Sequence, residues 1–338
     1  MRKLPVCVGL IFVYSTLGAI AVSRVATTSA QFLKIGIGAR ETGLGEAVVA
    51  GVSGDVSAIY WNVGAMSRAH LNKFVATHTD WFMDTRLDFV GALVPIRRVG
   101  VIGLALTAFN AGEFEQTTLD EQEGTGVKFT AGAYALHIAF GRNLTDRFSF
   151  GIGAKYITEN IWLMRASSFA IDVGMLYDLT RNCKLGISLS NFGGSMRLWG
   201  ENTRILYPIT EWQQELGTGV LGDLRTESWA LPLRFQVGLN WNFMLTPSTK
   251  WTVEVDAVHP NDNYEYINVG LEVSFLNMLF VRLGKKDIGG KVSDERFSMG
   301  IGLRLKPTAI KVPLTLDYTY TDYRYLGRVQ RIGVRFGW

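Results

Sequence analysis

The sequence predicts an all-β transmembrane fold, a 14-stranded antiparallel outer-membrane β-barrel with a small N-terminal hatch or plug segment. Three observations predict it. Fourteen strand-like segments can be counted in residues 71–338, their connectors alternate between short and long, and the side chains within a strand alternate between apolar and polar or small. Short turns at one end, longer loops at the other and two alternating faces are typical of barrels that cross an outer membrane.

Composition agrees with many lipid-facing strands rather than with helices. Of the 338 residues, 48% are apolar, only 19% are charged and 37 are glycine, whereas a soluble protein normally carries more charge. No run of about eighteen apolar residues follows the N-terminus, so transmembrane helices are not expected there. We therefore expect the apolar residues to be spread over the outer face of a barrel.

Residues 1–30 are expected to be a secretion signal peptide. Arg2 and Lys3 form a basic start, residues 6–22 are apolar, and small residues lead to a cleavage site after Ala30, with a cut after Ser23 as the alternative. A membrane anchor is less favoured because the apolar stretch is short for a span. The remaining chain is almost balanced in charge, so the basic pI predicts no nucleic-acid partner.

The connectors of the predicted barrel fall into two groups, which we expect to lie at opposite ends. The short group comprises residues 97–98, 141–146, 181–182, 245–248, 276–277 and 306–309. The long group comprises residues 79–85, 110–125, 159–167, 192–230, 258–264, 286–295 and 322–327. The short turns should face the periplasm and the long loops the cell exterior.

The alternation within strands predicts which side chains face the lumen. In residues 233–243, 297–306 and 310–321 an uninterrupted apolar face opposes polar or small residues, and the last strand ends on the aromatic Trp338. A soluble β-sandwich also alternates, but it does not need connectors of two lengths. By this parity the lumen receives Arg234, Glu254, Asp256, Glu272, Arg282, Arg304, Asp317, Arg331 and Arg335. They predict ion pairs that hold a hatch or an aqueous wall, and little apolar lumen surface.

Residues 31–70 break the strand pattern. They are rich in glycine, and residues 40–49 are expected to form a short helix that Gly43 and Gly45 weaken. Their glycines do not continue into a nucleotide-binding fingerprint. We expect this segment to lie inside the barrel of residues 71–338 as a hatch, with a periplasmic tail as the alternative.

Two blocks of the chain resemble a known family. Residues 32–36, 38–40 and 43–47, followed by Asp55 and Tyr60-Trp61-Asn62, resemble the N-terminal signature of the PorV/PorQ family. Residues 256, 259–260, 262–265, 268–272 and 282–284 resemble a second block of the PorV branch. The family is a division of the FadL-like 14-stranded barrels. Where that group usually has Asn-Pro-Ala, this chain has Asn62-Val63-Gly64-Ala65, and the missing proline predicts a looser turn.

The resemblance implies a role in type IX secretion. PorV-branch members receive secreted cargo by its C-terminal β-domain at the translocon barrel and pass it to a surface sortase, so these three would be the protein partners, with outer-membrane lipid around the barrel. The resemblance also makes Asp55, Tyr60, Trp61 and Asn62 the candidate hatch residues. The alternative function is a FadL-like outer-membrane channel for hydrophobic or small solutes.

The sequence predicts no enzyme, no cofactor and no metal site. The four histidines lack the spacing of metal ligands, and no serine or cysteine lies in a nucleophile motif. Asp256, His259 and Asp262 carry donors that a cation site could use, but a capped loop stiffened by Pro260 explains them more simply.

The long loops are the predicted site of partner contacts. Residues 192–230 are too long for a passive connection, and exposed aromatic side chains favour protein contacts; a loop folded into its own lumen is the alternative. The partner-binding candidates are Trp199, Tyr207, Trp212, Trp229, His259 and Asp262.

Overall fold

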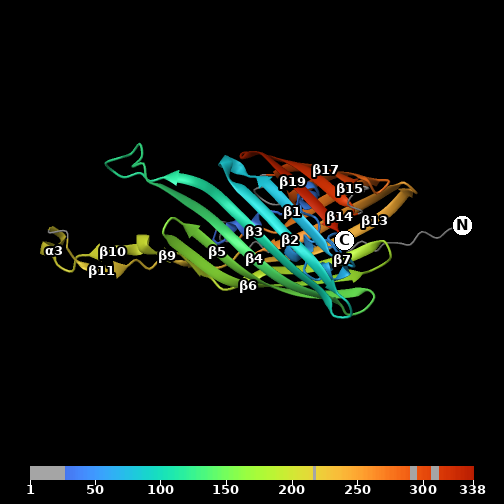
Figure 1. The fold of residues 1–338 in the computed structure, drawn as a ribbon, viewed down its shortest axis with the longest axis horizontal. Helices are drawn as coiled ribbons and strands as arrows, with labels where there is room; N and C mark the ends of the chain where they lie inside the picture. Colours follow the sequence, from blue (N-terminus) through green and yellow to red (C-terminus); the bar gives the residue numbers. More distant parts are fainter. Residues whose placement is uncertain (1–26, 216–217, 290–294, 306–311) are drawn as a thin grey trace.

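The computed structural model describes residues 27–215, 218–289, 295–305 and 312–338, and its main body is one closed antiparallel sheet (Figure 1). The first strand pairs with the last, since Lys73 lies opposite Gly337 and Asp80 opposite Gln330. Closure leaves no unpaired edge in the membrane. The predicted 14-stranded barrel is therefore confirmed. Its strands are β1 (Lys73–Asp80), β2 (Arg86–Ile96), β3 (Gly100–Glu115), β4 (Lys128–Asn143), β5 (Phe148–Ile161), β6 (Met164–Asp178), β7 (Cys183–Gly193), β13 (Arg234–Thr246), β14 (Thr249–Pro260), β15 (Tyr266–Phe275), β16 (Leu279–Ile288), β17 (Glu295–Leu305), β18 (Leu314–Tyr323) and β19 (Gly327–Gly337).

The described connectors follow the predicted two-ended arrangement with two corrections, and the short connector expected at residues 306–309 lies outside the described residues. The long loop expected at residues 322–327 is only residues 324–326, because β18 and β19 pair as far as Tyr323 and Gly327. The longest, residues 116–127 and 194–233, leave the same end of the barrel, and most turns at the other end are short. Residues 159–167 are not a loop as expected, because β5 and β6 continue through them and are joined only by Trp162 and Leu163. The alternation of side chains does not predict these strand ends, because β5 and β6 extend past their apolar stretch as a polar hairpin. The signal peptide expected at residues 1–30 lies almost wholly outside the described residues.

The connector of residues 194–233 builds a projecting arm of its own. The strands β10 (Arg204–Tyr207) and β11 (Val220–Asp223) form a hairpin with the helix α3 (Glu211–Glu215), and Figure 1 shows it extending away from the barrel. Closer to the barrel, β8 (Met196–Arg197) pairs with β12 (Ser228–Trp229), and β9 (Trp199–Gly200) pairs with β6; a 3-10 turn, η4, spans Glu201–Thr203. Another 3-10 turn, η3 (Phe82–Asp84), lies in the β1–β2 loop.

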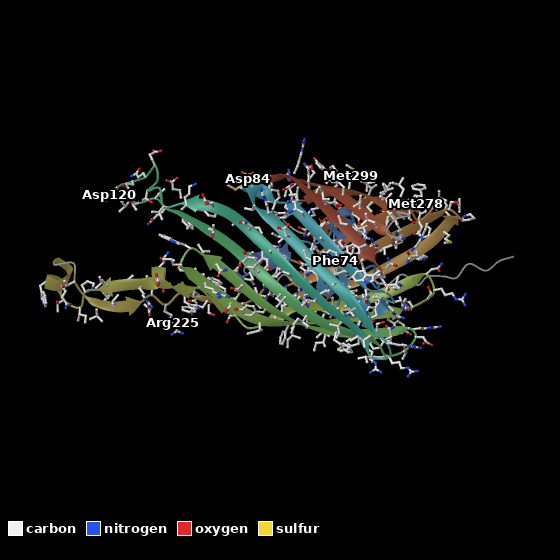
Figure 2. All side chains as sticks on the ribbon, viewed as in Figure 1. Phe74, Asp84, Asp120, Arg225, Met278 and Met299 are labelled. Carbon is white, nitrogen blue, oxygen red and sulfur yellow. The ribbon has the colours of Figure 1, made fainter. Side chains whose placement is uncertain are left out.

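The outer surface of the barrel is apolar, as membrane lipid requires. On β3 and β4, Leu104, Leu106, Leu136 and Ile138 are 42–54% exposed, each alternating with a buried neighbour. Figure 2 shows side chains covering the outside of the strands, with Asp120 and Arg225 toward the projecting end and Met278 toward the other. None of the helices in the described residues is long and apolar enough to cross a membrane.

The lumen is occupied by residues 31–70, which we call the hatch. Its regular elements are η1 (Gln31–Lys34), α1 (Ala39–Gly43), α2 (Ala58–Trp61) and η2 (Ala65–Arg68). The helix expected over residues 40–49 is shorter and begins earlier, because Gly45 and Glu46 both adopt left-handed backbone angles. Leu44, Ile59 and Trp61 are fully buried. The hatch therefore fills the lumen at their level and forms the centre of the apolar core.

Candidate functional site: the hatch and the lumen wall

The hatch lies against the inner wall with its backbone in contact. A Cβ placed on Gly151, Gly174 or Gly186 would lie 2.3–2.4 Å from a hatch atom, namely Val63 O, Asn62 Oδ1 and Val49 O respectively. On the opposite wall, Gly284 meets the backbone nitrogen of Gly45 in the same way. Any side chain at these inward positions would push the hatch away. Glycine at lumen-facing strand positions is thus the sequence signal for a tightly fitted hatch.

One half of the wall binds the hatch through charge. Arg335 Nη1 lies 2.7 Å from Asp55 Oδ2 of the hatch, and Arg335 Nη2 lies 2.7 Å from Asp317 Oδ2 of β18. Arg282 continues the network, with Nη1 2.6 Å from Asp317 Oδ1 and Nε 2.6 Å from Glu272 Oε2. Asp55 is therefore the hatch end of a chain of charges whose wall residues lie on β19, β18, β16 and β15.

Further contacts on the same side hold the first half of the hatch. Arg40 Nε lies 3.3 Å from Glu272 Oε2, and Lys286 Nζ lies 2.7 Å from Glu46 Oε1. Asp256 Oδ2 accepts hydrogen bonds from the backbone N–H groups of Val48 and Val49, at 2.7 and 2.9 Å. Charge-assisted bonds of this kind are stronger than neutral ones. The predicted ion-paired lumen is confirmed for this half of the barrel.

The other half of the wall is apolar, which the sequence analysis did not expect. The inward side chains of β2 to β6 include the buried residues Leu87, Phe89, Leu93, Val101, Ala105, Ala133, Ala135, Ala139, Ile157 and Leu176. Most are small or aliphatic, and on β4 Ala133, Ala135 and Ala139 share the middle of the inward face with His137. The expectation of little apolar lumen surface is therefore wrong, because small residues such as alanine are compatible with either face of a strand.

The hatch candidates Tyr60, Trp61 and Asn62 lie together on and just after α2. The Tyr60 hydroxyl donates to Leu33 O at 2.7 Å, and Trp61 Nε1 donates to Ile37 O at 3.2 Å. Asn62 Nδ2 donates to both Val49 O and Met175 O, at 2.8 and 2.9 Å. All three side chains therefore join the second half of the hatch to its first half, and Asn62 also reaches β6.

The turn after Asn62 is not loosened by the missing proline. Asn62 Oδ1 accepts the Gly64 N–H at 3.1 Å, and the Ala65 N–H donates to Asn62 O at 2.9 Å. A Cβ on Gly64 would lie 2.4 Å from Gly174 O. The side chain of Asn62 and the close approach of Gly64 fix this turn, so the expectation of a looser turn is wrong.

A second charged group lies inside the apolar half of the wall. Lys155 Nζ lies 2.7 Å from Asp172 Oδ2 and 2.8 Å from Asn191 Oδ1, and His137 Nε2 lies 3.3 Å from the same Asp172 oxygen. The backbone N–H of Asn191, which adopts a left-handed angle at a bulge in β7, donates to Asp172 Oδ1. Neither His137 nor Lys155 was singled out from the sequence, because each is a lone charge in an alternating strand.

The start of the hatch is held at the long-loop end of the barrel. Lys34 Nζ lies 2.9 Å from Asp262 Oδ2, and the Thr28 hydroxyl donates to the same oxygen at 2.6 Å. Burial alone would raise the pKa of Asp262, but the hydrogen bonds from Thr28 and Lys34 outweigh it and hold the pKa below its ordinary value. A cavity of about 140 Å³ lies beside this contact, lined in part by Leu33, Arg234 and Lys286.

The predicted partner-binding residues lie in three different environments in the structure. Trp199, Tyr207, Trp212 and Trp229 belong to the arm and are 48–66% exposed. His259 is exposed on the outside of β14, where its Nδ1 lies 3.0 Å from Glu265 Oε1. Asp262 is 1% exposed and belongs to the hatch contact instead. The loop of residues 192–230 therefore projects outward and does not fold into the lumen.

The structure does not bring Asp256, His259 and Asp262 together as a cation site. Asp256 faces the lumen, His259 faces outward, and Asp262 bonds to Lys34. Among the described residues, no group of three or more His, Cys, Asp or Glu side chains is placed to hold a metal ion.

Comparison with known proteins identifies the fold. No family model matches the chain, and no curated protein matches it. The Ralstonia pickettii toluene transporter TbuX superposes with a TM-score of 0.55 at 8% identity, over 89% of this chain and 97% of that one. The Pseudomonas putida toluene transporter TodX gives 0.53 at 11% identity, covering 89% and 96%.

A further structure, the CymD monoaromatic hydrocarbon channel, gives a TM-score of 0.53 at 10% identity, covering 89% of this chain and 96% of that one. At sequence identities this low, the superpositions are evidence of a shared fold and of nothing more. Together with the closed sheet, the apolar outer face and the N-terminal segment inside it, they show that this chain has the FadL-like fold of a 14-stranded integral outer-membrane β-barrel.

Proposed function

We propose that this protein is an outer-membrane channel for small or hydrophobic solutes and that the hatch is its gate. The apolar half of the lumen wall supports the proposal most directly. Alanine side chains at positions 133, 135 and 139 line the inward face of β4 beside the hatch, with His137 between the last two. A path for an apolar solute needs such a surface, because an apolar solute gains nothing from a charged wall.

The division of the wall also suggests how the gate works. The hatch is tied to the charged half by Asp55, Arg40 and Glu46. Its contacts with the other half are mainly apolar, and the polar bonds there, from Asn62 to β6, Ser67 to β4 and Arg68 to β6, lie within residues 62–68. Non-directional contacts are separated at lower cost than paired buried charges. The hatch therefore pivots on its charged side, and the apolar side opens.

Solute uptake into proteoliposomes tests the channel proposal. The purified barrel is reconstituted and challenged with toluene, a long-chain fatty acid and a small sugar, each measured against protein-free liposomes. We expect faster entry of at least one apolar solute, with the sugar close to the protein-free rate. Equal rates with and without protein for all three solutes would overturn the proposal.

A second candidate function is protein recognition by the arm, as PorV-like type IX secretion would require. The observation that favours it is the β10–β11 hairpin, where Leu206, Tyr207, Trp212 and Leu221 are 57–74% exposed. Exposed apolar clusters of this kind mark interaction sites. The hairpin projects from the long-loop end (Figure 1), the end that faces the cell exterior in outer-membrane barrels, and this supports the candidate.

Shortening the arm tests this second candidate. Arg204 lies opposite Asp223 in the hairpin, so residues 205–222 can be replaced by a two-residue turn without disturbing the barrel. In the source bacterium we expect proteins with a secreted C-terminal β-domain to be lost from the cell surface and retained in the periplasm. Unchanged surface display, with the shortened barrel present at its usual level, would remove this candidate and leave the channel.

A further inference from the structure

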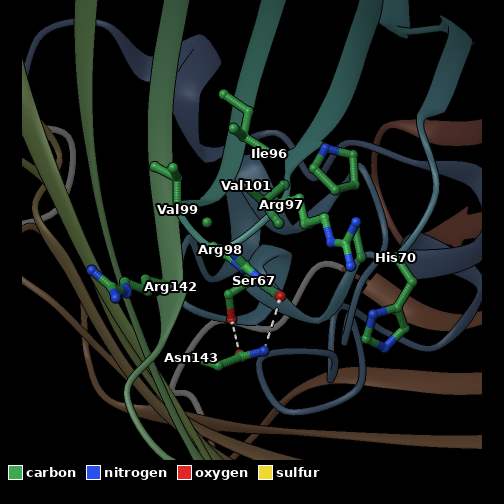
Figure 3. A pocket seen from close by; sticks show the side chains of 12 residues that line it. Ser67, His70, Ile96, Arg97, Arg98, Val99, Val101, Arg142 and Asn143 are labelled. Atoms are coloured by element: carbon green, nitrogen blue, oxygen red, sulfur yellow. Dashed lines mark hydrogen bonds between the residues drawn. The ribbon is translucent and has the colours of Figure 1, made fainter.

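A basic cavity lies at the short-turn end of the barrel, away from both the arm and the hatch contacts described above. It has a volume of about 560 Å³ and lies between the β2–β3 turn, the end of β4 and the last residues of the hatch (Figure 3). Arg97, Arg98, Arg142 and His70 line it, and no carboxylate does. A cavity lined by several basic side chains and by no carboxylate suits an anion.

The backbone brings these side chains together. Gly100 begins β3 opposite the end of β4, and a Cβ there would lie 2.5 Å from Gly141 O, so only glycine lets the two strands meet this closely. Arg98 adopts a left-handed angle, φ 66°, in the turn before it. A non-glycine residue in this region costs about 1 kcal/mol or more, and such a cost is commonly found at functional positions.

The floor of the cavity is fixed by hydrogen bonds. The Ser67 hydroxyl donates to Asn143 Oδ1 at 2.7 Å, and Asn143 Nδ2 donates to Ser67 O at 3.3 Å, as Figure 3 shows. The Ser149 hydroxyl donates to the same Asn143 oxygen. The hatch end and the β4–β5 turn are thus held as one surface below the arginines.

The three arginines are not used by the barrel itself. Within the described ranges, Arg97, Arg98 and Arg142 form no ion pair, whereas Arg68 nearby pairs with Asp178 at 2.9 Å. The lumen arginines 282 and 335 are likewise paired with carboxylates. Three unpaired guanidinium groups around one cavity leave their charge available to a molecule from outside the chain.

The β2–β3 turn and the end of β4, which border the cavity, lie where the apolar outer face of the barrel ends. Val94, Ile96 and Phe140 on the outer face are 37–49% exposed, and Arg97 and Arg142 follow them directly toward the strand ends. Along these strands the exposed side chains change from apolar to basic. This change matches the one in a bilayer from acyl chains to charged headgroups. Because the short turns of outer-membrane barrels face the periplasm, the headgroups at this level belong to the periplasmic leaflet.

We infer that this cavity binds the phosphate-bearing headgroup of an anionic phospholipid from the periplasmic leaflet. Guanidinium groups bind phosphate through paired N–H donors, and the exposed apolar side chains of Ile96 and Val99 beside the arginines could contact the acyl chains of the same lipid. A bound lipid would bridge the β2–β3 turn and β4, next to the end of the hatch. The inference does not depend on what the channel transports.

Native mass spectrometry of the detergent-purified barrel tests the inference. The protein is titrated with dimyristoylphosphatidylglycerol or with dimyristoylphosphatidylcholine, and bound lipid is counted. For the wild type we expect retention of phosphatidylglycerol over phosphatidylcholine. For Arg97→Gln/Arg98→Gln/Arg142→Gln we expect phosphatidylglycerol affinity to fall on the order of 10- to 100-fold, because each basic side chain near a lipid surface contributes several-fold.

A matched control removes three arginines from the long-loop end. Arg86, Arg197 and Arg225 are exposed there, and their glutamine variant should retain the wild-type preference. Both variants must show the usual gel-mobility shift of a folded barrel on heating. Equal loss in both variants, or no lipid preference in the wild type, would overturn the inference. Displacement of the lipid by millimolar inorganic phosphate would overturn the lipid assignment and make this a site for soluble phosphate.

Discussion

At the scale of single residues, the charged side chains of the lumen act between the hatch and the wall. Arg335 contacts Asp55 of the hatch and Asp317 of the wall at 2.7 Å each. The parity of the strands predicted that Arg335 and Asp317 face inward, and they do. The partner Asp55 could not be placed from the sequence, because contacts between residues 280 positions apart depend on how the hatch folds.

Removal of Asp55 should loosen the hatch without unfolding the barrel. In Asp55→Asn, Arg335 still pairs with Asp317 but loses its ion-pair partner in the hatch. Breaking a buried ion pair reduces the free energy of stabilisation by up to about 3 kcal/mol. We expect faster amide hydrogen exchange in residues 45–66 and unchanged exchange in β18 and β19. Asp120→Asn, at an exposed loop position, is the control. Unchanged exchange in the hatch would show that this ion pair does not hold it.

The close approach at Gly64 gives a second prediction. In Gly64→Ala the new Cβ meets Gly174 O, 2.4 Å away, and overpacking of this kind costs about 1–3 kcal/mol. We expect the turn of residues 62–65 to leave the wall, seen as lost protection of the Ala65 amide. Gly222→Ala, where nothing lies within 4 Å of the new Cβ, should match the wild type. Protection retained in Gly64→Ala would contradict the close fit.

At the scale of elements, the sequence predicted the strands well and the lumen incompletely. Period-two alternation located β13, β17 and β18 because one face of each meets lipid and the other does not. The hairpin of β5 and β6 was mistaken for a loop, since polar residues beyond the membrane carry no lipid-facing signal. The apolar half-wall was missed because alanine and glycine are compatible with either face.

The contact between η1 and the β14–β15 loop should be sensitive to acid. The pKa of Asp262 is lowered in the folded protein, so its stabilising contribution is complete above the unfolded value of about 3.9 and is lost as pH falls through the lower folded pKa. A nitroxide at Gln31→Cys, with Cys183→Ser to remove the native thiol, should remain immobile at pH 5 and become mobile only below about pH 4.

Asp262→Asn separates this effect from general acid unfolding. The variant lacks the charge that Lys34 meets, so the nitroxide should already be mobile at neutral pH, where the barrel is intact. If the nitroxide became mobile at the same pH in Asp262→Asn and in the parent protein, the transition would belong to a titrating group other than Asp262.

At the scale of the whole molecule, the two ends and the two halves of the barrel differ. The arm extends from the long-loop end, and the unpaired arginines 97, 98 and 142 lie at the short-turn end. Across the lumen, charges on β14 to β19 face the apolar residues of β2 to β6. Charges tie the hatch to β14–β19, whereas mainly apolar contacts hold it against β2–β6; this is the arrangement that a gate requires.

A reversible covalent lock between hatch and wall tests this account most directly. A Cβ on Gly91 of β2, in the apolar half of the wall, would lie 2.9 Å from Val56 Cγ1 of the hatch, so cysteines at these two positions lie within reach of a disulfide. Apolar solute flux is measured in proteoliposomes for Val56→Cys/Gly91→Cys in a Cys183→Ser background, with each single cysteine variant as control. The account predicts that oxidation abolishes flux, that a reductant restores it, and that the single variants respond to neither. Equal flux through the oxidised and reduced barrel would contradict a gate formed by the hatch.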